Sequence, residues 1–105
     1  MDNFKVIYKI LRSLEKNMGN DEFDIKSVSA ERTNISFERW EQLLIMMQDE
    51  GYIKGLVLSS GLSSTYRHIT EPIRPQITIK GLEYLAENSL MRKAKEALKM
   101  AGEIL

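Results

Sequence analysis

Residues 35–58 read ISFERWEQLLIMMQDEGYIKGLVL, and this stretch predicts the fold of the chain. Its apolar residues recur at the spacing of one helical face, which comprises Trp40, Leu43, Leu44 and Met47, with Phe37 at its edge. Ser36 is expected to cap this helix, because its hydroxyl can accept a hydrogen bond from a free amide of the first turn. Gly51 is expected to end the helix, since glycine readily takes the left-handed conformation. Strand-forming residues follow at Tyr52–Leu58.

A helix over about residues 36–50 that passes through a glycine into a strand is typical of the third helix and wing of a winged helix. The wing is expected over about residues 52–79. Its loop at Ser59–Ser64 is small and polar, and Thr65–Ile69 is expected to return as a strand. Gln76–Ile79 alternates in polarity and is expected to pair with the strand that follows the third helix.

The first half of the chain predicts two further helices. Asn3–Met18 carries an apolar stripe made of Ile7, Ile10, Leu11, Leu14 and Met18, with Phe4 and Val6 beside it. Asp21–Ile25 is expected to be a brief strand or an extended lead-in. Lys26–Thr33 is expected to be a short helix that tertiary packing must stabilise, because its helix propensity is poor. Two short helices joined by about three residues make a helix-turn-helix.

The remaining residues predict a short helix at Lys80–Asn88, with Thr78 or Lys80 near its start, and a final helix at Leu90–Leu105 capped by Ser89. The apolar stripe of the final helix could pack on the first helix, or pair with a second copy to make a homodimer. We therefore expect one α+β domain over residues 1–105: a winged helix-turn-helix with a C-terminal helix.

Composition indicates an ordinary globular protein, with 43% hydrophobic and 29% charged residues. The absence of cysteine excludes disulfides and thiolate metal sites, which fits a cytoplasmic location. No apolar run suggests a signal peptide or a membrane span. The net charge is zero, but residues 1–50 carry 7 Lys+Arg against 10 Asp+Glu, whereas residues 51–105 carry 8 against 5. The positive charge therefore lies on the wing and C-terminal segment.

Two segments resemble a known family. They are the run at residues 51–55, GYIKG, and the run at residues 77–88, ITIKGLEYLAEN. Together with the C-terminal segment, they are similar to the YjcQ-like family of small bacterial and phage-associated proteins. The resemblance covers most of the chain. It implies a winged-helix fold whose molecular role is unassigned and which is often presumed to bind DNA.

The third helix is a candidate DNA-reading element, through Ser36, Arg39 and Gln42. Gln42 could read adenine, and Arg39 could read guanine or hold a phosphate. However, residues 36–50 contain four carboxylates and one cation, which disfavours a groove lined by phosphates. The stripe expected to face outward comprises Glu38, Gln42, Ile45 and Asp49, so Ile45 and its neighbour Met46 are candidates for contact with a protein partner instead.

The wing supplies the other DNA-binding candidates: Tyr66, Arg67, His68 and Arg74. These could contact phosphates, or they could be solvated charges at a sheet edge. The two hypotheses are thus a regulatory module that binds double-stranded DNA, and a winged helix that binds a protein.

Catalysis and cofactor binding find no support in the residues. His68 is the one histidine, so neither a metal site nor a Ser/His pair is indicated. The glycines form neither a phosphate-binding loop nor a dinucleotide fingerprint. We expect no enzyme activity and no cofactor.

Overall fold

The computed structural model describes residues 2–62 and 65–88. In chain order, its elements with defined bounds are α1 (Asn3–Lys16), the 3-10 helix η1 (Ile25–Val28), α2 (Ala30–Thr33), α3 (Phe37–Asp49), β1 (Ile53–Lys54), β2 (Val57–Ser59), β3 (His68–Thr70) and β4 (Gln76–Ile77). Residues 79–88 are also helical. The expected final helix, its Ser89 cap and the homodimer built on it lie outside the described residues.

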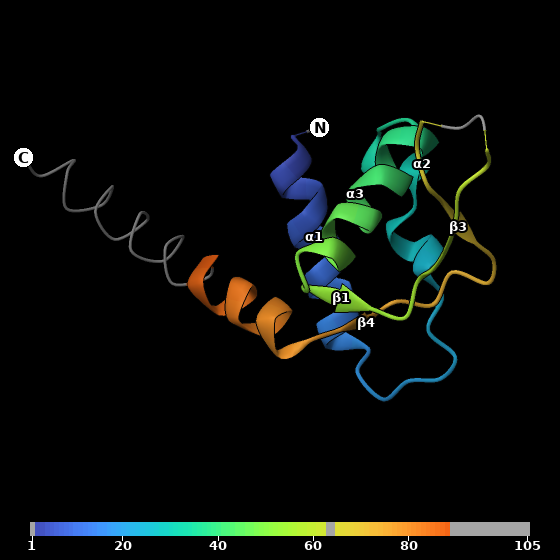
Figure 1. Cartoon of the computed structure of the whole chain (residues 1–105). Coiled ribbons are helices and arrows are strands. Elements are labelled where there is room, and N and C mark those ends of the chain that lie inside the picture. The colour runs from blue at the N-terminus through green and yellow to red at the C-terminus, as the bar shows by residue number, and fades with distance from the viewer. Residues whose placement is uncertain (1, 63–64, 89–105) are drawn as a thin grey trace, which may run out of the picture.

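The winged-helix layout is confirmed (Figure 1). The helix α3 lies across α1, α2 precedes it through a short turn, and the hairpin segments follow it. The helix at 79–88 follows β4 almost directly and lies on the opposite side of α1 and α3 from β3. The core between these elements is formed by apolar side chains that include Val6, Ile10, Leu11, Leu14, Leu44, Met47, Ile53 and Leu85.

Capping side chains explain where the helices begin. The Asp2 carboxylate accepts a hydrogen bond from the Phe4 amide at 2.7 Å, as expected for a cap of α1. Ser36 caps α3, and its hydroxyl accepts from the Arg39 amide at 3.2 Å. Thr78 accepts from the Gly81 amide at 3.1 Å at the start of the helix 79–88. Ile79 therefore begins a helix instead of extending the strand predicted over Gln76–Ile79.

The segment before α3 differs from its prediction. Residues 21–24 form no strand, and the expected helix Lys26–Thr33 is split into η1 and α2. Ser29 makes the break, because its extended backbone ends η1 while its side chain caps α2. The helix α1 is also shorter than predicted, so Met18 lies beyond it and is exposed.

The predicted strand Tyr52–Leu58 is interrupted at Gly55, whose φ of 96° a strand cannot accommodate. The two halves pair with different partners. At the base of the wing, β1 pairs antiparallel with β4, as expected, through Ile53 opposite Ile77. Further out, β2 pairs antiparallel with β3, through Leu58 opposite Ile69. The returning strand is His68–Thr70 rather than Thr65–Ile69.

Candidate nucleic-acid interface

The side of α3 that faces solvent differs from the side that the sequence predicted. Ile45 is 1% exposed, so the expectation that it faces outward is wrong. Glu41, on the same side, is 5% exposed, whereas Met46 is 56% exposed. The wing explains the difference, because β3 packs against α3 and covers one side of the helix. The open side of α3 carries Arg39, Met46 and, half-buried, Gln42.

Glu41 places a buried carboxylate beneath the wing. One of its oxygens accepts a hydrogen bond from the backbone amide of Ile69 at 3.0 Å. The other lies 2.8 Å from Nδ1 of His68, whose side chain is more than half exposed. A buried carboxylate is costly unless it is hydrogen-bonded, and these contacts satisfy it. His68 is therefore held against α3.

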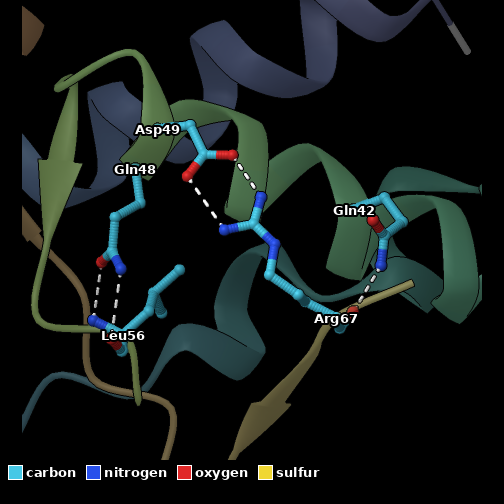
Figure 2. Close-up of polar contacts among 5 residues, drawn as sticks. All are labelled: Gln42, Gln48, Asp49, Leu56 and Arg67. Atoms are coloured by element: carbon cyan, nitrogen blue, oxygen red, sulfur yellow. Dashed lines mark hydrogen bonds and ion pairs between the residues drawn. The ribbon is translucent and has the colours of Figure 1, made fainter. Parts of the chain in front are cut away.

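Arg67 forms a two-pronged ion pair with Asp49 at the end of α3 (Figure 2). Its Nη1 donates to Oδ1 of Asp49 at 3.2 Å, and its Nη2 donates to Oδ2. The hydrogen bond to Arg67 holds the pKa of Asp49 below its usual value, and the same contact raises the pKa of Arg67. Both side chains remain exposed, but the positive charge of Arg67 and the negative charge of Asp49 offset each other at this point.

Two glutamines of α3 bind the backbone of the wing (Figure 2). Nε2 of Gln42 donates to the carbonyl oxygen of Arg67 at 2.8 Å. Gln48 binds both polar groups of Leu56: its Oε1 accepts from the Leu56 amide at 2.8 Å, and its Nε2 donates to the Leu56 carbonyl at 3.1 Å. Leu56 lies between β1 and β2, where the strand is interrupted. Gln48 therefore supplies the pairing that a neighbouring strand would otherwise provide.

We name the set Glu41, Gln42, Gln48 and Asp49 the wing clasp, because each binds the wing through its side chain. Sequence reasoning missed Glu41 and Gln48 as contact residues. The signal was present, since positions 41, 45 and 48 follow helical spacing and so share one side of α3. Glu41 and Gln48 lie on either side of Ile45 along the helix, and both bind backbone groups of the wing that covers this side.

The remaining candidates are distributed over two places. Arg39 is exposed in the first turn of α3, next to its cap Ser36, and forms no ion pair with any residue that the structure describes. Tyr66 is exposed beside Arg67. Arg74 lies at the base of the wing, where its carbonyl approaches Gly55. The structure thus brings Gln42 and Arg67 into contact and leaves Arg74 in a separate region of the wing.

A metal site and a membrane span would each place requirements on residues 2–62 and 65–88. Within these ranges no group of three or more His, Asp or Glu side chains could hold a metal ion. No helix in the same ranges has the length and apolar character needed to cross a membrane.

The helix-turn-helix of α2 and α3, followed by a hairpin wing, defines a winged-helix protein. The family model for the YjcQ protein matches residues 8–104. The chain belongs to the YjcQ family. No curated protein matches the chain, and no solved structure matches it either.

Proposed function

We propose that this protein is a regulatory module that binds double-stranded DNA through the open side of α3. In a winged helix the third helix enters the major groove and its outward residues meet base edges. We assign this role to Arg39 and Met46, which are exposed on the open side of α3, with half-buried Gln42 at its margin. Ser36, the cap of α3, would lie against the phosphate backbone.

The wing clasp carries this proposal, because it removes the main electrostatic objection to DNA binding. Of the four carboxylates of the third-helix segment, Glu41 is buried and Asp49 is paired with Arg67. Only Glu38 and Glu50 remain exposed without an ion-pair partner among the described residues. A helix with these two charges and Arg39 repels phosphates far less than the sequence count suggests.

Binding of the full-length protein to a mixed-sequence DNA duplex, followed by fluorescence anisotropy at increasing salt, tests the proposal. Affinity should fall as salt rises, because bound phosphates release counterions. Arg39→Ala should lower the salt slope by about 1, the loss of one phosphate contact. Arg12→Ala on α1 is the control, since Arg12 pairs with Glu15 away from α3. Absence of binding at low salt would overturn the proposal.

A second candidate function is protein binding through the same side of α3. The exposure of Met46 favours it, since a large apolar side chain at the centre of an open helix face suits a protein contact. The burial of Ile45 weakens it, because the apolar spot is then a single residue. Met46→Glu should abolish capture of a protein partner in a pull-down.

A further inference from the structure

A second surface, distinct from the open side of α3, lies between η1, α2 and residues 71–74. Here the structure forms a broad groove. Its apolar lining is made by Phe23, Ile25, Ala30, Ile35, Phe37, Trp40, Pro72 and Ile73. Neither Arg39 nor Met46 belongs to it. The groove therefore lies apart from the two side chains proposed to meet base edges.

Phe37 is the prominent side chain of this groove. It is 52% exposed, although it lies in the first turn of α3 next to the core. Its ring contacts that of Trp40, with centroids 5.8 Å apart. Trp40 is buried, and its indole nitrogen donates to the Val28 carbonyl at 2.8 Å, which fixes the ring. An exposed aromatic ring on a rigid base is the usual anchor of a protein-binding surface.

The rim of the groove is acidic. Its described charged residues are the five carboxylates Asp21, Glu22, Asp24, Glu31 and Glu71, and the three cations Lys26, Arg32 and Arg74. None of these side chains forms an ion pair with another residue in the described part of the chain. The excess of carboxylates attracts cations and repels nucleic acid. The face of Phe37 also favours an arginine or lysine.

We propose that this groove binds a partner protein through an amphipathic segment rich in lysine and arginine. The apolar side chains of that segment would pack on Phe37, Ile35 and Ile73. Its cations would face the carboxylates of the rim, among them Glu31 and Glu71. This role goes beyond the proposed DNA binding, and neither depends on the other.

Trp40 provides the test, because it is the one tryptophan of the chain and lines the groove. The full-length protein is titrated with two synthetic amphipathic peptides that share one leucine pattern. One peptide has lysine at its polar positions, and the other has glutamate. The lysine peptide should shift Trp40 emission saturably, and the glutamate peptide should leave it unchanged. Phe37→Ser and Glu71→Lys should each weaken binding by about tenfold or more.

Glu87→Lys is the matched charge control, because Glu87 is exposed on the helix 79–88, outside the groove. It should bind the lysine peptide like the natural protein, and so should Arg39→Ala. Equal binding of the two peptides would overturn the proposal, as would equal loss in Glu71→Lys and Glu87→Lys. Because Glu71 is exposed, its variant stays informative even if Phe37→Ser disturbs folding. A failure of DNA binding would leave all these outcomes unaffected.

Discussion

Glu41 connects α3 to the wing through two hydrogen bonds beneath the protein surface. Glu41→Ala would leave the buried amide of Ile69 without an acceptor, which costs about 1–3 kcal/mol. We therefore expect this variant to lower the free energy of unfolding by that amount in urea denaturation. Glu41→Gln retains one acceptor oxygen and should lose less. Glu87→Ala, on an exposed position, should change stability little, and an equal loss in all three variants would contradict the role assigned to Glu41.

Gly81 allows the helix 79–88 to approach the start of the wing. A Cβ atom at this position would lie 2.3 Å from the Tyr52 carbonyl oxygen and 2.7 Å from Cγ1 of Ile77. Alanine normally stabilises a helix relative to glycine by about 1 kcal/mol. Here we expect the opposite sign, a loss of about 1–3 kcal/mol from overpacking, measured by urea unfolding. A gain in stability for Gly81→Ala would show that the helix does not pack so closely.

The Asp49–Arg67 pair makes a prediction about acid pH. Because the pKa of Asp49 is lowered in the folded state, the pair stabilises the fold above the unfolded pKa of about 3.9. This contribution is lost as the pH falls through the folded pKa, and it is small because the pair is exposed. In an NMR titration of the carboxyl groups, Arg67→Gln should raise the Asp49 midpoint toward its ordinary value. An unchanged midpoint would contradict the ion pair.

At the scale of elements, Gln48 determines how the wing is attached to α3. Its side-chain amide occupies both backbone groups of Leu56, at the interruption between β1 and β2. In Gln48→Ala we expect faster hydrogen exchange at the Leu56 amide, because that amide loses its acceptor. Gln48→Glu keeps the acceptor for the amide but opposes a carboxylate to the Leu56 carbonyl, so it should also destabilise the wing. Unchanged exchange in Gln48→Ala would show that water replaces the glutamine at no cost.

The elements were predictable where local signals agree. The Ser36 cap, the apolar stripe at Trp40, Leu43 and Leu44, and the glycine stop define α3 within a residue at each end. The break in the wing strand was missed, because Gly55 has the same sequence signal whether its φ is negative or positive. The split at Ser29 was also missed, although the poor helix propensity of Lys26–Thr33 pointed to it.

At the scale of the whole molecule, the candidate site was harder to predict than the fold. Ser36 and Arg39 were found from the helix alone, because they depend on local position. The contacts of Glu41 with His68 and of Asp49 with Arg67 join residues far apart in sequence. They depend on the register of β2 and β3, which no local pattern specified. For this reason the sequence prediction assigned Ile45 to the outward side of α3, whereas the structure buries it.

Two different surfaces result from this arrangement. One is the open side of α3, which carries Arg39 and Met46, and near which the wing buries Glu41 and pairs Asp49 with Arg67. The other is the acidic groove around Phe37. A protein with both could join DNA to a basic protein partner, and each surface can be altered without the other.

The wing covers the Ile45 side of α3 and leaves the Met46 side open. Because the chain has no cysteine, single cysteines can be introduced and their reaction with a thiol reagent timed. Met46→Cys should react at nearly the rate of a free thiol. Ile45→Cys should be strongly protected until denaturant unfolds the protein. Equal rates in the folded protein, or faster reaction at position 45, would contradict the arrangement of α3 and the wing described above.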